Sequence, residues 1–261
     1  MPLFKITLAY DGTDYVGWQR QANGVSIQGL IEEALLALDG REVTVAGSGR
    51  TDAGVHALGQ VASFTIARAI APDALVRALN ASLPHAVRVL SAEAAPPAFH
   101  PRFGARTKTY RYRIWNGEVM NPFERRYAWH VPGALDVEAM RAAARVIEGR
   151  HDFAAFQSTG GDVTTTEREI FQSTIQSTIQ STFRNPQSAM LVYEVVGTGF
   201  LRHMVRTIAG SLVEIGRGRR PVAWMSDVLA SRDRAAAGPT APPQGLFLVR
   251  VEYGDALAAG S

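Results

Sequence analysis

The sequence predicts an α+β protein made of two ferredoxin-like, RRM-like halves, with mainly antiparallel sheets joined around a central cleft and helices on the outer faces. In the first half the segments follow the order strand, helix, strand, strand, helix, strand, which is the split βαβ arrangement. The dipeptide Pro96-Pro97 then marks a linker, after which the pattern repeats in outline. We therefore expect an N-terminal half over residues 1–104 and a C-terminal half over residues 105–261.

Each element of the first half carries a local signal. Apolar and polar side chains alternate over residues 3–10, which is typical of a half-buried strand. Ser26 is a suitable N-cap for a helix with apolar residues at helical spacing, and Asp39-Gly40 ends it. Pro72 opens a second helix that ends at Pro84. The remaining apolar runs predict strands over residues 43–46, 60–67 and 87–91.

The second half is predicted in the same way. Tyr110, Tyr112 and Ile114 alternate with arginines, so this strand has one aromatic face and one cationic face. Asp136 is a suitable cap for a helix that ends at Gly149. The later elements are a polar loop over residues 157–169, a strand over 190–196, a helix containing Ile208 and Leu212, a short helix from Pro221 to Arg232 and a last strand over 245–249.

The motif Gln-Ser-Thr-Ile is written nearly three times over residues 172–182. A helix is disfavoured by so many Ser and Thr residues. As a strand, the segment places on one face Phe171, Ile175, Ile179 and Phe183. Because a four-residue slip reproduces the same pairings, the register of this strand is ambiguous. The sequence does not assign the repeat a function.

Composition bounds the class of protein. The 261 residues are 46% hydrophobic and 20% charged, which is ordinary for a globular protein of one or two domains. The absence of cysteine excludes disulfides, thiolate metal sites and a cysteine nucleophile. No apolar run approaches the ~18 residues of a membrane span, and the first residues lack the layout of a signal peptide. We therefore expect a cytoplasmic protein that does not enter a membrane.

A glycine-rich polar loop lies between two predicted strands and reads Gly47-Ser48-Gly49-Arg50-Thr51-Asp52-Ala53-Gly54-Val55-His56-Ala57. Glycines this close together let the backbone approach another group or adopt φ > 0. Arg50 and Asp52 can both project from such a loop, and a cation within ~4–6 Å keeps a carboxylate ionised. An ionised, oriented Asp can be a nucleophile, a base or a metal ligand. On the residues alone, a turn whose Asp caps neighbouring amides is an equal alternative.

Basic residues are clustered although the net charge is only +3. The two clusters are Arg102, Arg106, Lys108, Arg111 and Arg113, and Arg202, Arg206, Arg217, Arg219 and Arg220. Either cluster alone would indicate only a solvated face. The turn over residues 10–21 adds aromatic and amide side chains of the kind that stack on bases and bond their edges. Taken together, these features favour a nucleic-acid partner.

Four motifs resemble those of a single enzyme family and occur in order along nearly the whole chain. They are the loop Gly49–Ala57, the turn Tyr10–Gln21, the run Lys108–Tyr112 and the run Gly197–Arg206. The nine residues of the loop resemble the signature loop of the TruA-type tRNA pseudouridine synthases. The repeat over residues 172–182 departs from the family pattern and looks like a tandem duplication that lengthens a hairpin.

The resemblance implies roles for four residues. Asp52 is implied to be the catalytic aspartate, and Arg206 to enter the active site and pair with it. Tyr110 is implied to pack on the target base, with Leu246 as an apolar contact to that base. Arg50, from its place in the loop, is expected to be a further substrate-binding residue or a second counter-ion of Asp52. The implied substrate is tRNA, at uridines 38–40 of the anticodon stem-loop, shared by the two subunits of a homodimer. The reaction needs no cofactor or metal, and Asp52 could attack either the sugar C1′ or the uracil C6.

Two other interpretations fit parts of the sequence. A non-catalytic RNA-binding protein could use the same basic and aromatic surface, but none of the predicted strands has RNP-type aromatic spacing. A hydrolase could use Asp52 with His56, but a second well-placed carboxylate and a metal-type spacing of His and acids are missing. The pair His151-Asp152 has no nucleophile nearby in sequence, and we interpret it as structural. We therefore favour the isomerase.

Overall fold

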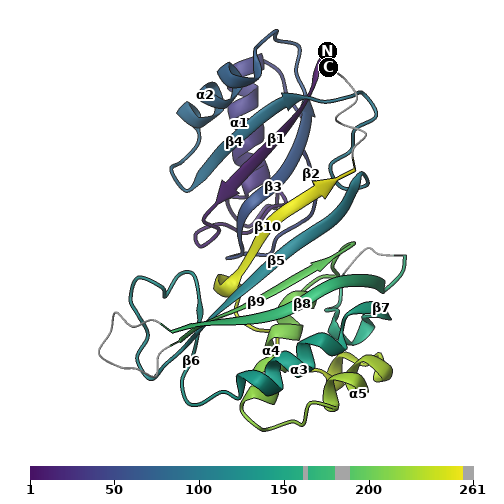
Figure 1. Cartoon of the computed structure of the whole chain (residues 1–261). Helices are drawn as coiled ribbons and strands as arrows, with labels where there is room; N and C mark the ends of the chain where they lie inside the picture. Colours follow the sequence, from purple (N-terminus) through teal and green to yellow (C-terminus); the bar gives the residue numbers. More distant parts are fainter. Residues whose placement is uncertain (161–163, 180–188, 255–261) are drawn as a thin grey trace. The chain divides into compact units, whose positions relative to one another are not determined.

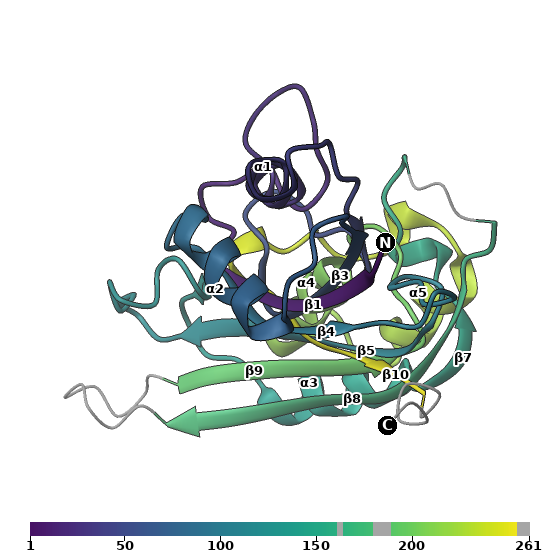
Figure 2. The ribbon, with the colours of Figure 1, turned by 90° about the horizontal axis from the view of Figure 1, so that it is seen from above.

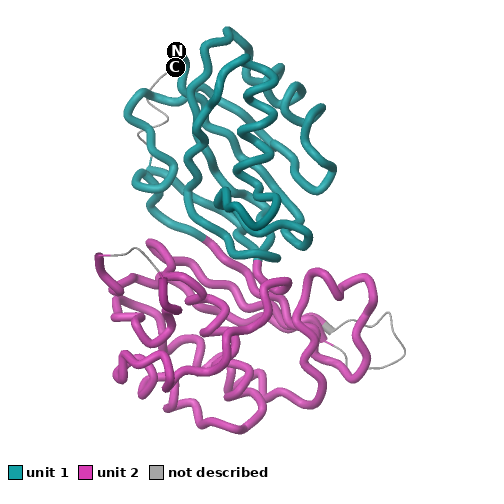
Figure 3. Tube along the Cα trace, turned by 180° about the vertical axis from the view of Figure 1, so that it is seen from behind, with its two compact units in different colours: residues 1–108, 247–261 teal, residues 109–246 magenta. Residues whose placement is uncertain are grey.

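The computed structural model describes residues 1–160, 164–179 and 189–254, which form two compact units (Figure 1). Unit 1 comprises residues 1–108 and 247–261, and unit 2 comprises residues 109–246 (Figure 3). The sequence places a boundary after residue 104 and assigns everything beyond it to the second half. The two units differ from that division in residues 105–108 and in the last strand, which returns to unit 1.

Unit 1 begins with the predicted order of elements. These are β1 (Leu3–Tyr10), α1 (Ile27–Asp39), β2 (Ala46–Gly47), β3 (His56–Thr65), α2 (Pro72–Ser82), β4 (Val87–Ala94) and, from Phe247 on, β10 (Leu246–Tyr253). β1 lies between β4 and β3 and is antiparallel to both, and β2 is antiparallel to β3. β10 pairs with β3 in parallel. The two helices pack side by side, as Figure 2 shows from above.

Two predicted strands of unit 1 have different bounds in the structure. Val43 and Val45 are buried but do not join a strand, and β2 is limited to Ala46–Gly47. The reason is that α1 satisfies the backbone of Val45: its N–H donates to Glu32 Oε1 at 3.2 Å, and its carbonyl accepts from Gln28 Nε2 at 3.0 Å. The apolar residues Val43 and Val45 therefore indicate that this segment is buried, but not that it pairs as a strand. β3 begins at His56, earlier than the predicted residue 60, because its first residues pair with β10.

Unit 2 contains the longer strands and the buried helix of the C-terminal half. Its elements are β5 (Ala105–Asn116, within unit 2 from Thr109 on), β6 (Trp129–Val131), α3 (Val137–Val146), β7 (Gly149–Asp152), η1 (Ala154–Phe156), β8 (Glu167–Ile179), β9 (Ala189–Gly197), α4 (Met204–Gly216), α5 (Trp224–Ser231), η2 (Arg234–Ala236) and η3 (Pro243–Gly245). The strand order is β5-β9-β8-β7, and β6 pairs with β5. α3 packs against β8 and α4, whose residues are almost all buried. The protein is thus α+β with mainly antiparallel pairing.

The repeat forms most of β8, but one predicted face is wrong. Ile170 pairs with Gly197 and Gln172 with Val196, so Phe171 is an extra residue at a bulge and its side chain is 51% exposed. After the bulge, Ser173 and Ile175 are buried. The predicted position of Phe183 lies outside the described residues, and so does the end of the repeat.

Partners outside the repeat distinguish its copies. The Ser173 N–H donates to Glu148 Oε1 at 2.8 Å, and its hydroxyl lies 3.2 Å from the hydroxyl of Tyr193. Arg141 donates from Nε to the Ile175 carbonyl at 2.9 Å. Because the repeat itself cannot select a register, these contacts from α3, its following turn and β9 select the one observed.

The N-terminus of α1 explains a glycine that helix propensity disfavours by about 1 kcal/mol. Ser26 Oγ caps the helix by accepting the Gly29 N–H at 3.2 Å. A Cβ on Gly29 would lie 3.1 Å from this oxygen and within 4 Å of no other group. Gly29 therefore leaves room for the cap.

This geometry predicts that the two positions are coupled in stability. Ser26→Ala should cost about 1 kcal/mol because the cap is lost. Gly29→Ala should stabilise by up to about 1 kcal/mol in the Ser26→Ala background, but clearly less in the wild type, where the new methyl presses on Ser26 Oγ. Urea unfolding of the four proteins measures the coupling. Strictly additive effects would show that Gly29 has another role.

Candidate functional site

Between β2 and β3 the chain forms a loop of residues Ser48–Val55, named the signature loop after the motif that it shares, and backbone hydrogen bonds hold it to the rest of unit 1. Ser48 donates its N–H to the carbonyl of Val61 at 2.8 Å, and the Thr51 carbonyl accepts from the N–H of Trp18 at 3.0 Å. Within the loop, the Val55 N–H donates to the Asp52 carbonyl at 3.1 Å. The side chain of Asp52 is half-buried. After Asp52, the Gly54 N–H donates to the Tyr15 carbonyl at 3.3 Å, so other segments fix the backbone on both sides of this carboxylate.

Glycine at position 17 allows the turn before α1 to reach this loop. Gly17 has φ of 100°, in the left-handed region, and a Cβ there would lie 2.4 Å from the Thr51 carbonyl oxygen. Any side chain would therefore both strain the backbone and push the loop away. The turn over residues 10–21, predicted to contact RNA, is also the support of the loop that carries Asp52.

Arg50 lies on the exposed side of the same loop. Its Nε donates to Gln19 Oε1 at 3.1 Å, which joins the signature loop to the aromatic and amide turn. This side chain is therefore positioned by unit 1 itself, as a substrate-binding residue has to be.

His56 has a different environment from the one that the hydrolase interpretation requires. It is fully buried, and its ring stacks on Phe247 with centroids 4.6 Å apart. Its Nδ1 accepts the Gly12 N–H at 3.1 Å and lies 3.2 Å from Asp11 Oδ1. These contacts fasten β3 to the turn after β1 and to the returning strand. His56 is therefore a packing residue of unit 1, and the Asp52–His56 hydrolase is not supported.

Tyr110 is on β5, in unit 2. It is 8% exposed, and its ring meets that of Phe200 edge-on, with centroids 5.0 Å apart and planes at 76°. This edge-to-face contact restrains the orientation of the Tyr110 ring. The sequence motif contains Phe200, but nothing in the sequence indicates that it orients Tyr110.

Arg206 lies in the first turn of α4 and is anchored to the loop that precedes β10. Its Nε donates to the Ala241 carbonyl at 2.7 Å, and its own carbonyl accepts the Ala241 N–H at 3.1 Å. The next residue of that loop, Pro242, accepts from the hydroxyl of Tyr112 at 2.7 Å. Burial raises the pKa of Tyr112, and the charge of Arg206 opposes this only in part, so the phenol remains a donor.

The entry to α4 is strained. His203 precedes the helix with φ of 62°, in the left-handed region that non-glycine residues rarely adopt. Its Nδ1 is 2.8 Å from Ser158 Oγ. Strain of this kind persists where the surrounding structure enforces it, and it often marks a functional segment. Here it sets the start of the helix that carries Arg206.

Leu246 follows η3 and is 6% exposed. The glycine before it is required by packing, because a Cβ on Gly245 would lie 2.7 Å from the ring of Tyr112. Unit 2 thus brings together Tyr112, Arg206 and the loop leading to Leu246. Asp52 and Arg50 belong to unit 1.

The basic clusters are less free than the sequence suggests. Several members have partners in the folded units: Arg111 pairs with Glu194 at 2.8 Å, Arg113 with Glu124 at 2.8 Å and Arg219 with Glu214 at 3.1 Å, and Arg220 lies over the ring of Trp224 at 5.2 Å. The clusters are therefore partly neutralised in the folded units.

Across the residues that the structure describes, no helix is long and apolar enough to cross a membrane.

Known proteins match this chain over nearly all of its length. A family model described as tRNA pseudouridine synthase matches residues 6–104 and 143–254. The tRNA pseudouridine synthase A of Myxococcus xanthus is 48% identical over 255 residues, which cover 98% of this chain and 93% of that protein. That of Pelobacter propionicus is 46% identical over 256 residues, covering 97% and 100%. The chain belongs to the tRNA pseudouridine synthase family.

Membership in the synthase family confirms the resemblance inferred from the four motifs. The chain is an isomerase, and the reaction of its family is the conversion of uridine to pseudouridine in tRNA. The interpretation as a non-catalytic RNA-binding protein is therefore wrong. RNA recognition in this chain serves a reaction.

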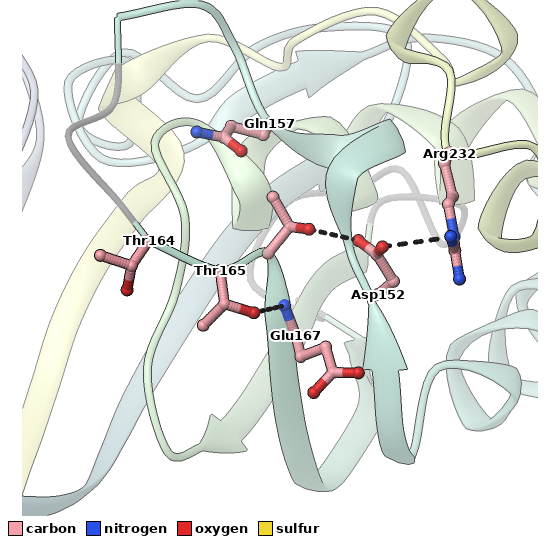
Figure 4. A pocket seen from close by; sticks show the side chains of 7 residues that line it. Asp152, Gln157, Thr164, Thr165, Glu167 and Arg232 are labelled. Atoms are coloured by element: carbon pink, nitrogen blue, oxygen red, sulfur yellow. Dashed lines mark hydrogen bonds and ion pairs between the residues drawn. The ribbon is translucent and has the colours of Figure 1, made fainter.

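Unit 2 of the synthase also has a polar pocket of about 460 Å³ where β7 ends and β8 begins (Figure 4). Its lining is Asp152, Gln157, Thr164, Thr165, Thr166, Glu167 and Arg232, so it contains none of the site residues predicted from sequence. Asp152 accepts from Thr166 Oγ1 at 2.5 Å and from the Ala154 N–H at 3.0 Å, and it pairs with Arg232 at 3.2 Å. These bonds fit the structural role inferred for Asp152.

The environment of Asp152 predicts a pH-dependent contribution to stability. The bond from Thr166 is the main reason that the pKa of this carboxyl is lowered. A lowered folded-state pKa stabilises the protein above the unfolded pKa of about 3.9, and the effect is lost as pH falls through the folded value. Asp152→Asn should cost about 1 kcal/mol at pH 7 and progressively less below pH of about 4.

Urea unfolding between pH 3 and 7 measures this difference. The matched control is Glu42→Gln, which removes an exposed carboxylate from unit 1 and should have little effect at any pH. A cost for Asp152→Asn that does not vary with pH would contradict the assignment.

Proposed function

We propose that this chain isomerises uridines 38–40 in the anticodon stem-loop of tRNA, with Asp52 as the nucleophile. The observation that carries the proposal is the placement of Asp52: its carboxylate is half-buried on a loop whose backbone is fixed by Trp18 and Val61. Nucleophilic catalysis needs a carboxylate that is held in one place and shielded in part from water.

The reaction converts the uridine into an isomer of the same composition. Asp52 attacks the sugar C1′ or the uracil C6, and the C1′–N1 bond breaks. The detached uracil turns over and a bond forms between C1′ and C5. The C5 proton leaves to solvent, N1 takes up a proton from solvent, and the bond to Asp52 breaks so that the carboxylate is regenerated. Nothing is oxidised or reduced and no group is donated from outside, so the reaction formally needs no redox cofactor or group donor.

Arg206 is assigned as the counter-ion of Asp52. A cation beside a carboxylate lowers the carboxyl pKa and keeps the nucleophile ionised. The bond from Arg206 Nε to the Ala241 carbonyl directs its guanidinium, and the bond from Tyr112 to Pro242 fixes the same loop. Arg50, exposed on the signature loop, would contact the RNA strand beside the target nucleotide.

Tyr110 and Leu246 would hold the detached base. A uracil stacked on a tyrosine ring gains about 1–3 kcal/mol, and the contact with Phe200 orients that ring. The tyrosine hydroxyl could also assist removal of the C5 proton. The target nucleotide must leave its stack at a cost of a few kcal/mol, which phosphate and shape contacts elsewhere would supply.

A tRNA bound by two subunits would require this chain to form a dimer. We propose a cytoplasmic homodimer with two-fold symmetry, in which both subunits contact one tRNA. The 48% identity to a tRNA pseudouridine synthase A supports a tRNA substrate for this chain. The exposed members of the two basic clusters, such as Arg102 and Arg202, would contact its phosphates.

The nucleophile is tested with a tRNA transcript tritiated at uracil C5. Wild-type protein should release tritium to water, and Asp52→Ala should release none while still binding the tRNA, because the carboxylate supplies chemistry and not affinity. Asp73→Ala, which removes an exposed carboxylate at the start of α2, is the matched control and should retain turnover. Turnover by Asp52→Ala would exclude it as the nucleophile.

The role of the Tyr110 hydroxyl is tested separately. Tyr110→Phe keeps the stacking ring and should bind tRNA normally, but tritium release should fall by on the order of 10²-fold if the hydroxyl assists proton transfer. Tyr110→Ala should in addition weaken capture of the base. A full rate for Tyr110→Phe would restrict this residue to stacking.

A further inference from the structure

A buried amide on β3 bonds the signature loop at two residues, Ser48 and Gly49. Gln60 is 0% exposed. Its Oε1 accepts from Ser48 Oγ at 2.7 Å and from the Val61 N–H at 3.2 Å. Its Nε2 donates to the Gly49 carbonyl at 2.9 Å and to the hydroxyl oxygen of Tyr10 at 3.4 Å. Since donors and acceptors are matched, the orientation of the amide is fixed.

One of these bonds continues toward the nucleophile. The hydroxyl oxygen of Tyr10 accepts from Gln60 and lies 2.8 Å from Thr51 Oγ1, in a hydrogen bond that either hydroxyl can donate. Tyr10 is buried, and burial raises its pKa to about 12, so it stays a neutral hydroxyl. This chain of hydrogen bonds ends at the residue directly before Asp52.

We propose that Gln60 is a positioning residue for the isomerisation, which sets the place of Asp52 through Gly49 on one side and through Tyr10 and Thr51 on the other. This rests on the proposed role of Asp52 as nucleophile. Gln60 touches no reacting atom in this scheme. Ser48, Thr51 and Tyr10 are buried as well, so water cannot easily replace a bond that is lost.

The chemistry of the site requires an amide. Glutamate has the same shape, but its ionised form has no donor for the Gly49 carbonyl or for Tyr10. Methionine has a similar length and fills the space without any strong hydrogen bond. Misplacement of a reacting group by 1 Å can cost on the order of 10²-fold in rate. The loss should therefore appear in turnover and not in RNA binding.

The test compares Gln60→Met with wild type and with Ser63→Ala, a control that changes another buried polar side chain on β3 outside this network. Thermal unfolding, tRNA binding, and kcat and KM for tritium release are measured for each. Gln60→Met should lower kcat by about 10- to 100-fold with KM and Kd within about threefold. Ser63→Ala should keep kcat. A folded Gln60→Met protein with the kcat of this control would overturn the proposal.

A second variant decides the matter if Gln60→Met does not fold. In Gln60→Glu, burial favours the neutral carboxylic acid, whose single O–H can donate to the Gly49 carbonyl. The activity of this variant relative to wild type should therefore fall as pH rises and the acid ionises. A ratio that is independent of pH would count against positioning by Gln60.

Asp52→Ala, assayed in parallel, distinguishes a failure of the proposed nucleophile from a failure of the proposed role of Gln60. If Asp52→Ala turns over, the proposed nucleophile is wrong and the role of Gln60 falls with it. If Asp52→Ala is inactive and folded Gln60→Met is fully active, only the role of Gln60 is wrong.

Discussion

The pairing of β1 with β3 is the interaction on which the site in unit 1 depends. Along β1 the inward side chains are apolar until the last one, Tyr10, whose hydroxyl meets the buried polar groups beneath the signature loop. Antiparallel pairing puts the start of β3 beside the end of β1, so His56 and Gln60 lie at the same end. The apolar part of the pair provides rigidity, and its polar end uses that rigidity to fix a loop.

In unit 2 a loop is fixed by two side chains and not by a strand pair. A strand, β5, and a buried helix, α4, each send a side chain to consecutive carbonyls of the loop before β10. Tyr112 and Arg206 thereby hold the same loop at adjacent residues, and the charge of Arg206 acts on the hydroxyl of Tyr112. Strain at His203 belongs to this arrangement, because the helix must begin where Arg206 reaches the loop.

Sequence alone predicts the local features well, and the reasons are visible in particular residues. The alternation over β1, the Ser26 cap and the Asp136 cap depend on neighbours within a few positions, and all three are found. The signature motif indicates a candidate nucleophile, because its residues are contiguous. The family can be inferred from the same motif, because its residues are adjacent in the sequence.

What sequence misses depends on partners far along the chain. The pairing of Arg111 with Glu194 spans 83 positions, and the contact between Tyr112 and Pro242 spans 130. Gln60 looks like an ordinary polar residue in a strand until the loop folds over it. Phe171 has the right period but the wrong face, because the bulge depends on β9. In each case the contact that determines the environment of the residue comes from another strand, helix or loop.

The return of the last strand to unit 1 has a consequence for synthesis. Unit 2 is one uninterrupted stretch, 109–246, so all of it has been made before residue 247 leaves the ribosome. Unit 1 cannot place Phe247 against His56 until the final strand emerges. Because domains fold as their residues become available, the unit that carries Tyr110 and Arg206 can mature first. The loop that carries Asp52 gains this last support only after β10 has been synthesised.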